Sequence, residues 1–294
     1  MSIIAGATIS GKPKNEDAVA VFTNLQAGIQ GAIVADGIGS MPYCHLASAF
    51  VVNDLKKRLE SLSDFSVGGL KIIFSECLTV FTTYSDKIKK ETEGFDPEKW
   101  MGTTVISCIE TKDELIVAYV GNGAAWHIRG DFNHFNKVCT YFPWNAINIL
   151  NPHTVQDPTT NSEAIYRLFF PAAKPEHVRP SIIRIEKEKT PPGDILMVCT
   201  DGIFSNDQAI VGKASGILWQ KIDQTMDHFF QYLDSFINRG EYQEQNLQQL
   251  LNEYLGFLSE KKLLDDDATI GIIISSESIG FLTEKHQDQT IKNG

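Results

Sequence analysis

The order in which strand-like and helix-like patterns succeed one another constrains the fold of this 294-residue chain more than any other feature. Short β-branched segments come in groups, and the helix-like segments between those groups come in pairs. Such clustering favours antiparallel sheets with helices on their outer faces. A doubly wound nucleotide-binding fold would alternate strand and helix more regularly. We therefore predict an α+β fold, a four-layer α-β-β-α sandwich of two stacked, mainly antiparallel sheets flanked by helices.

Four amphipathic helices are indicated by apolar residues that recur every three to four positions. The first runs from Pro42 to Leu59, and Pro42 suits a first helical turn. The others are expected at 70–81, 226–236 and 247–258. Strands are expected at 2–10, 18–24, 28–37, 103–110, 114–121, 124–130, 181–187, 194–202 and 268–275. The three strands between 103 and 130 are expected to form a meander with a turn at "TKDE".

One hydrophobic core is expected, because strands from both ends of the chain carry the motifs described below. The stretch 133–180 holds six prolines and little periodicity. It is long for a loop in a compact domain, so it is interpreted as functional or as a small excursion beside the core. Beyond Ser276 the chain is polar, and we expect a frayed, flexible tail over 277–294.

Residues 6–17, "GATISGKPKNED", admit two incompatible interpretations. Gly6, Gly11 and Lys12 fit the pattern G-x-x-x-x-G-K of a loop that cradles nucleotide phosphates. That loop requires Ser or Thr after the lysine and a helix that begins there. Here Pro13 follows, and "EDAVAVF" continues as a strand, so no helix dipole would face a phosphate. A P-loop nucleotidase is therefore disfavoured.

The second interpretation is that Glu16 and Asp17 belong to a metal site. Further carboxylates flank strands in a shared pattern, with Asp36 in "AIVADGIG", Asp201 in "LMVCTDGI" and the run 265–267 in "LLDDDATIGIII". Aspartate at a strand end extends into the cleft between sheets, and a following glycine lets backbone approach closely. All-oxygen ligands select Mg²⁺ or Mn²⁺. Because so many carboxylates in one place repel one another, two cations are predicted.

Composition excludes several other classes of function. The formal net charge of -11 argues against a surface for nucleic acid or anionic membrane. No apolar run approaches the ~20 residues that span a bilayer, and no export signal is visible near the start. The five cysteines show no CxxC pair or zinc-like spacing. Four of them sit among apolar neighbours, so we expect buried, reduced thiols of a cytoplasmic protein.

At this point the motifs resemble those of the metal-dependent Ser/Thr protein phosphatases, the type 2C or PPM group, in its bacterial form. The matching blocks occur in the family's order and cover nearly the whole chain. They are "NEDA" (15–18), "VADGIGS" (34–40), "MGTTV" (101–105), "YVGNG" (119–123), "GDILMVCTDGI" (193–203) and "DDATIGIII" (266–274). The resemblance implies one phosphatase domain over residues 1–276, with 133–180 as a variable, flap-like insertion.

The resemblance also implies roles for individual residues. Asp36 would bridge two Mn²⁺ or Mg²⁺ ions, and the carbonyl of Gly37 would serve one of them. Asp201 and Asp266 would complete one site, and Glu16 would serve the other, partly through water.

Two residues near Glu16 receive further roles. Asp17 is a further candidate metal ligand, but it follows Glu16 on an expected strand, so its side chain should point the other way. It would act from behind the ligands, or where the strand twists. Lys12 stands four places before Glu16, where the family usually has an arginine that contacts substrate phosphate. Lysine lacks the bidentate fork of arginine, so the grip on substrate should be weaker.

Two departures from the family pattern stand out. Ile38 replaces a histidine that eukaryotic members often carry, which is proposed to protonate the leaving group. Asn122 replaces an aspartate implicated in a third metal site, and its neutral amide argues against that site here. These departures leave one alternative open, a pseudophosphatase that binds phosphoproteins as a regulatory module without turnover.

The sequence thus predicts a phosphomonoester hydrolase that acts on phosphoserine or phosphothreonine in proteins. Two cations would lower the pKa of a bridging water, and the resulting hydroxide would attack phosphorus in line. The cations and Lys12 would offset charge on the phosphoryl oxygens. The expected partners are a phosphorylated protein substrate and a counterpart Ser/Thr kinase in signalling. We expect no nucleic-acid or membrane partner, and a monomer.

Overall fold

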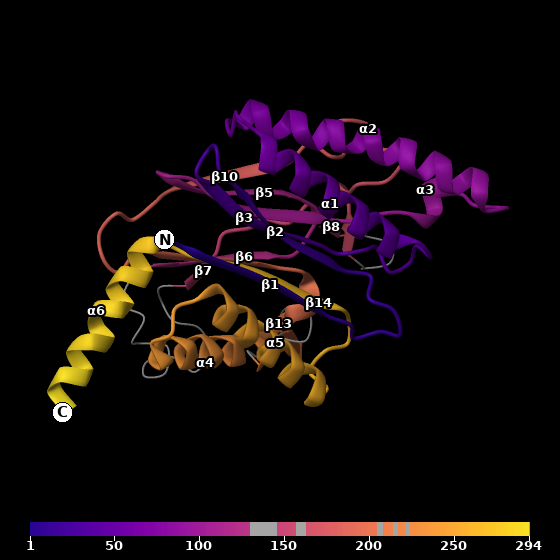
Figure 1. The fold of residues 1–294 in the computed structure, drawn as a ribbon. Coiled ribbons are helices and arrows are strands. Elements are labelled where there is room, and N and C mark those ends of the chain that lie inside the picture. The colour runs from indigo at the N-terminus through magenta and orange to yellow at the C-terminus, as the bar shows by residue number, and fades with distance from the viewer. Residues whose placement is uncertain (130–145, 157–162, 205–207, 214–216, 222–223, 294) are drawn as a thin grey trace.

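A computed structural model of the chain describes residues 1–129, 146–156, 163–204, 208–213, 217–221 and 224–293. Two five-stranded sheets lie one on the other in this part of the chain (Figure 1). Sheet A has the spatial order β1 (Ile3–Ile9), β14 (Ala268–Ile274), β11 (Asp194–Cys199), β6 (Ala124–Arg129) and β7 (Ala146–Asn148). Sheet B has the order β10 (Ser181–Glu186), β5 (Glu114–Val120), β4 (Val105–Glu110), β3 (Ile29–Ala35) and β2 (Ala18–Asn24). Every neighbouring pair in both sheets is antiparallel.

Helices cover the outer faces of both sheets (Figure 1). On the side of sheet B lie α1 (Cys44–Ser61), α2 (Val67–Glu91) and the short α3 (Pro97–Trp100). On the side of sheet A lie α4 (Gln224–Arg239) and α5 (Glu244–Glu260), and α6 (Ser276–Asn293) ends the chain. The smaller elements are the hairpins β8 (Thr154–Gln156) with β9 (Glu163–Ile165) and β12 (Gln208–Lys213) with β13 (Ile217–Lys221), and the 3-10 turn η2 (Asp201–Ile203). The predicted α+β sandwich is confirmed.

Three hydrophobic clusters correspond to the three interfaces of a four-layer sandwich. One joins sheet A to α4 and α5, one joins sheet B to α1 and α2, and one fills the space between the sheets. Strand β3 shows how one segment serves two interfaces, because side chains alternate across a sheet. Ile33 belongs to the cluster beneath the helices, while Ala32 and Val34 belong to the cluster between the sheets. Strands buried on both faces read as continuous apolar runs.

The amphipathic patterns place α1, α2, α4 and α5 correctly. The apolar residues that predict α2, α4 and α5 are all buried. Ser66 caps α2, since its hydroxyl accepts a hydrogen bond from the backbone N–H of Gly69 at 3.2 Å. The helix after β3 begins at Cys44, so Pro42 lies in the preceding turn rather than in the first helical turn. In the described part of the chain no helix has the length and apolar character needed to cross a membrane.

The predicted meander is wrong in its third strand. Strands β4 and β5 form the expected hairpin, with the turn closed by Thr111 and Glu114. Strand β6 instead leaves sheet B and pairs with β11 in sheet A. Gly121 and Gly123, with φ of 108° and 120°, turn the chain between the two sheets. Such angles favour glycine strongly, so the crossover depends on this pair.

The stretch 133–180 is only partly an excursion. Residues 130–145 and 157–162 lie outside the described residues. Within the remainder, β7 pairs with β6 as the edge strand of sheet A, so this part belongs to the core architecture. Phe169 forms an isolated bridge with Thr103, and its ring packs against Phe74 of α2. The stretch therefore connects the outer helical layer to the segment beside Asp36.

The tail is helical, which corrects the expectation of a frayed segment. Helix α6 covers Ser276–Asn293 and extends from the body of the molecule (Figure 1). Its beginning is anchored, because Leu282 is buried and Ile279 and Phe281 pack against the cluster under sheet A. So few apolar residues give no amphipathic pattern from which the helix could be predicted.

Candidate metal centre

Asp36 follows the last residue of β3, and its backbone is fixed to the segment that leads into β4. Its carbonyl accepts hydrogen bonds from the backbone N–H of Thr104 and the hydroxyl of Thr103, both at 2.8 Å. Next to it, a Cβ atom on Gly37 would lie 2.6 Å from the carbonyl oxygen of Glu16. Only glycine permits that approach. The end of β3 is thereby held against the loop that carries Glu16.

Asp201 and Asp266 are brought together by the pairing of β11 with β14. Strand β11 ends at Cys199, two residues before Asp201, and Asp266 stands two residues before the start of β14. In an antiparallel pair the end of one strand lies beside the start of the other. A Cβ atom on Gly202 would lie 1.9 Å from the carbonyl oxygen of Asp267, so the two segments touch through backbone. The predicted importance of the glycine after each aspartate rests on these two contacts.

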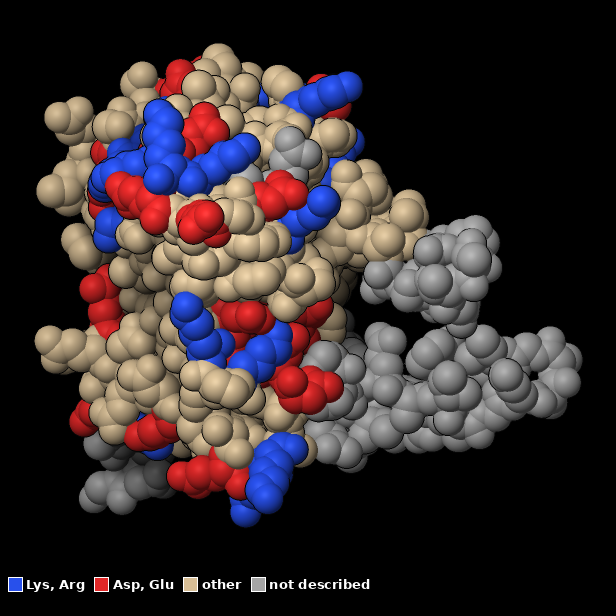
Figure 2. Space-filling model, turned by 90° about the vertical axis from the view of Figure 1, so that its right-hand side faces the viewer, with Lys and Arg blue, Asp and Glu red and all other residues tan. Residues whose placement is uncertain are grey.

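Like charges surround the carboxyl group of Asp36. Burial raises its pKa well above the usual value, and the charges of Asp17, Asp201 and Asp266 raise it further. Three of the strand-end carboxylates predicted from the sequence therefore lie within electrostatic reach of one another. In Figure 2, which faces the side where β1 leads into β2, Asp and Glu side chains gather with Lys or Arg side chains in the lower middle.

Asp17 lies deeper than its neighbour Glu16. Both residues precede β2, so the expected strand alternation does not apply to them. Asp17 is 8% exposed, and its Oδ2 accepts a hydrogen bond from the hydroxyl of Thr200 at 2.8 Å. Burial, helped by the charge of Asp267, raises the pKa of Asp17 to about 7 despite the hydrogen bond from Thr200. Its other oxygen, Oδ1, is buried without a hydrogen bond from any described residue.

Asp267 clamps the loop that leads from β1 to β2. Its Oδ1 accepts hydrogen bonds from the backbone N–H groups of Gly11 at 2.9 Å and Lys12 at 3.2 Å, and its Oδ2 accepts one from that of Glu16 at 2.6 Å. The carboxylate oxygens of Glu16, Asp266 and Asp267 lie within 4.8 Å of one another. Sequence reasoning named the acidic run but missed this anchoring role. The only sequence signal for this role was an acidic residue directly before an apolar strand.

The ammonium group of Lys12 lies on this acidic cluster. Its Nζ is 2.8 Å from Oε2 of Glu16 and 2.6 Å from Oδ1 of Asp266. Partial burial lowers the pKa of Lys12, but the hydrogen bonds and charges of these two carboxylates outweigh it, so the pKa lies above its usual value. The lysine is therefore charged at neutral pH.

Asn122 supports a carboxylate of the cluster. Its Nδ2 donates a hydrogen bond to Oδ2 of Asp201 at 2.8 Å. The loop that carries it is held by His153, whose Nδ1 accepts a hydrogen bond from the backbone N–H of Gly121 at 3.1 Å. The backbone of His153 also donates to the carbonyl of Gly121 at 2.9 Å. Sequence reasoning missed His153, because it lies in the poorly patterned stretch.

Acid should weaken the fold through His153. Burial, with the charge of Arg167, lowers its pKa to about 4, whereas an unfolded histidine titrates near 6.5. The folded state thus binds fewer protons between these values. Its stabilising contribution is complete above about pH 6.5 and is lost as pH falls toward 4. His153→Asn, which keeps an acceptor near Nδ1, should show a smaller loss of unfolding free energy from pH 7 to pH 5 in urea titrations with EDTA. An equal loss in both proteins would contradict this.

The donor set fits hard divalent cations. Every candidate side chain offers oxygen, as Mg²⁺ and Mn²⁺ require. Burial and neighbouring carboxylates raise the pKa values of Asp17 and Asp36, so their ionised forms need positive charge nearby, which a bound cation would supply. The unpartnered Oδ1 of Asp17 adds a buried acceptor that a cation or its water could satisfy.

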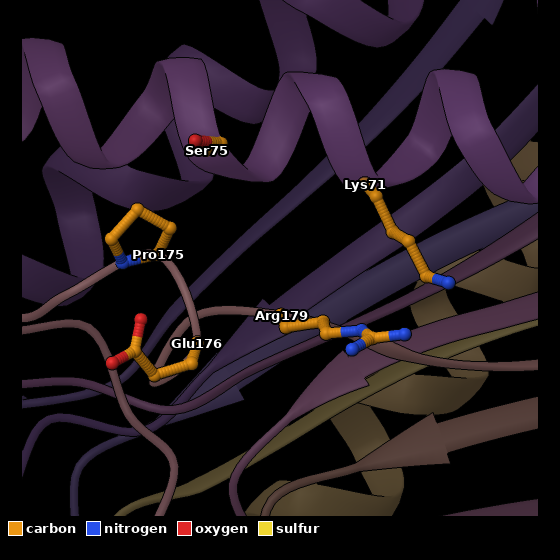
Figure 3. A pocket seen from close by; sticks show the side chains of 5 residues that line it. All are labelled: Lys71, Ser75, Pro175, Glu176 and Arg179. Carbon is orange, nitrogen blue, oxygen red and sulfur yellow. The ribbon is translucent and has the colours of Figure 1, made fainter.

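A separate depression of about 300 Å³ lies between α2 and the segment before β10, lined by Lys71, Ser75, Pro175, Glu176 and Arg179. Lys71 and Arg179 extend in the same direction, whereas Pro175 and Glu176 come from the loop opposite Ser75 (Figure 3). None of the clustered carboxylates lines it, so it is distinct from the candidate metal centre.

Comparison with known proteins agrees with this architecture. The protein phosphatase 2C family model matches residues 7–256. No curated protein matches the chain. The serine/threonine phosphatase Stp1 from Staphylococcus aureus is 18% identical, with 94% of this chain and 96% of that chain covered and a TM-score of 0.59. The S. agalactiae serine/threonine phosphatase is 17% identical, with 94% and 100% covered and a TM-score of 0.62.

A third solved structure contains metal. The catalytic domain of the serine threonine protein phosphatase PstP, in complex with two manganese ions, is 16% identical, with 92% of this chain and 97% of that chain covered and a TM-score of 0.56. The structural likenesses show a shared fold, and the family model covers most of the sequence. The chain belongs to the protein phosphatase 2C family of metal-dependent protein phosphatases.

Proposed function

We propose that the acidic cluster is the catalytic metal centre and binds two Mn²⁺ or Mg²⁺ ions. The ligands would be the carboxylates or carbonyl of Glu16, Asp17, Asp36, Gly37, Asp201 and Asp266. The observation that carries this proposal is the burial of Asp36 among Asp17, Asp201 and Asp266, because such a group is costly without cations. Asp36 would bridge the two ions.

The chain's own groups would orient the reaction. Bound divalent cations make water nucleophilic at neutral pH and offset negative charge on a phosphoryl group. Asp267 and Thr200 would hold Glu16 and Asp17 in place, since both already bind these segments. Lys12 would contact the substrate phosphate as a point charge. Asn122 would orient Asp201 rather than build a third metal site.

The finer assignments follow from this chemistry. We propose phosphoserine and phosphothreonine in proteins as the substrates, with a Ser/Thr kinase as the opposing enzyme. The four cysteines in the described part of the chain are free and buried, which suits a cytoplasm that keeps thiols reduced. We propose a monomer with one catalytic domain over residues 1–276, in which residues 133–180 form a variable, flap-like insertion.

A phosphate-release assay tests this function. Purified protein treated with EDTA should release no phosphate from a phosphothreonine or phosphoserine peptide, and added Mn²⁺ should restore release. Binding of both Mn²⁺ and phosphopeptide without any release would instead identify a pseudophosphatase. Because a cation that binds only the folded state raises its stability, Mn²⁺ should also raise the melting temperature. An unchanged melt would exclude a tight metal site.

A further inference from the structure

Lys12 makes contacts that a phosphate-binding lysine does not require. Its backbone is fixed, because its N–H donates to Asp267 at 3.2 Å and its carbonyl accepts from the hydroxyl of Ser10 at 2.6 Å. From this position the side chain turns to the acidic cluster rather than to open solvent, and only 31% of the side chain is exposed. The loop therefore aims the ammonium group at carboxylates.

The two contacted carboxylates come from opposite ends of the chain. Nζ lies 2.8 Å from Glu16 and 2.6 Å from Asp266, so the ammonium group of Lys12 joins the β1–β2 loop to the segment before β14. A Cβ atom on Gly39 would lie 3.1 Å from this Nζ and 3.3 Å from Oε2 of Glu16, so backbone closes the contact on one side. Charge-assisted hydrogen bonds of this length are strong.

The proposed metal centre needs the same two carboxylates. Divalent cations held by Glu16 in one site and by Asp266 in the other would share these carboxylates with a like-charged ammonium a few ångströms away. Coulomb repulsion at that separation is large even with solvent screening. Lys12 and the cation therefore cannot both keep these contacts.

We propose that Lys12 is an internal counter-cation of the metal centre, which pairs with Glu16 and Asp266 until a divalent cation displaces it. The inference rests on the proposed function in taking these carboxylates as metal ligands. Displacement frees the ammonium group for substrate phosphate only after the cation is bound. By reciprocity, an anion that draws Lys12 away from the carboxylates tightens cation binding.

Metal titration without substrate tests the proposal. We compare wild type, Lys12→Met and the matched control Lys14→Met by calorimetric titration of EDTA-treated protein with Mn²⁺. Lys14 is an exposed lysine of the same loop that forms no ion pair among the described residues. Lys12→Met should bind Mn²⁺ about tenfold more tightly than wild type, within the range of typical couplings between sites. Lys14→Met removes the same formal charge and should leave the affinity unchanged.

Thermal melts separate this role from general electrostatics. Without metal, Lys12→Met should melt below Lys14→Met, because Glu16 and Asp266 lose their counter-cation, and saturating Mn²⁺ should remove that difference. Equal or weaker Mn²⁺ affinity in Lys12→Met would overturn the proposal. If wild type binds no Mn²⁺ at all, the metal centre itself is refuted. If all three proteins bind it equally, the proposed function stands and only the counter-cation role is lost.

Discussion

Asp36→Asn should lower Mn²⁺-dependent phosphate release from a phosphothreonine peptide by about 10³-fold or more. Asp36 is the residue that we assign to both cations, so its loss weakens two sites at once. Asparagine keeps the size and one oxygen of the side chain, and the backbone contacts of Asp36 with Thr103 and Thr104 do not involve the carboxyl group. The comparison is made as kcat at saturating Mn²⁺ and peptide.

The same substitution should raise stability when metal is removed. Burial and the charges of Asp17 and Asp201 oppose ionisation of Asp36, so a neutral amide relieves repulsion in the folded state. With EDTA at pH 7.5, Asp36→Asn should have a higher melting temperature than wild type. Added Mn²⁺ should raise the melting temperature of the variant less than that of wild type. Activity and metal-free stability thus move in opposite directions. Full turnover in the variant would show that Asp36 has no role in the reaction. A melting temperature below that of wild type without metal would show that the loss of activity comes from misfolding.

The predictable part of the site is the part that strand ends determine. Asp36 and Asp201 could be placed because each follows an apolar strand, and the glycine after each indicates close backbone approach. The structure shows those approaches, because a Cβ atom added at Gly37 would lie 2.6 Å from the carbonyl oxygen of Glu16 and one at Gly202 would lie 1.9 Å from that of Asp267. The α+β layers could be predicted from the order of the elements, because helices that occur in pairs between groups of strands must cover the faces of the sheets.

The parts that could not be predicted depend on tertiary contacts without local pattern. Asp267 looked like one acid in a run, yet three backbone N–H groups of a loop far away in sequence determine its role. Strand β6 has an ordinary strand composition, and only the positive φ angles at Gly121 and Gly123 send it to the other sheet. Helix α6 could not be predicted, because its sequence is mostly polar and only a few buried apolar residues anchor it to the cluster under sheet A.

Gly202→Ala should destabilise the protein by about 3 kcal/mol or more. The added methyl group would lie 1.9 Å from the carbonyl oxygen of Asp267, and its nearest neighbours are all backbone atoms, so no flexible side chain can move aside. Relief requires β11 and β14 to separate at the end that carries Asp201 and Asp266. We expect a melting temperature lower by roughly 6–12 °C, together with a smaller stabilisation by Mn²⁺.

Gly256→Ala is the matched control, because it makes the same chemical change in open space. Gly256 lies inside α5, and a Cβ atom there meets nothing within 4 Å. Alanine is the better helix former, so this variant should gain about 0.5–1 kcal/mol. The opposite signs assign the effect at Gly202 to the backbone contact rather than to loss of a glycine. If Gly202→Ala melted like wild type and kept its Mn²⁺ response, the two carboxylates would not depend on this close approach of β11 to β14.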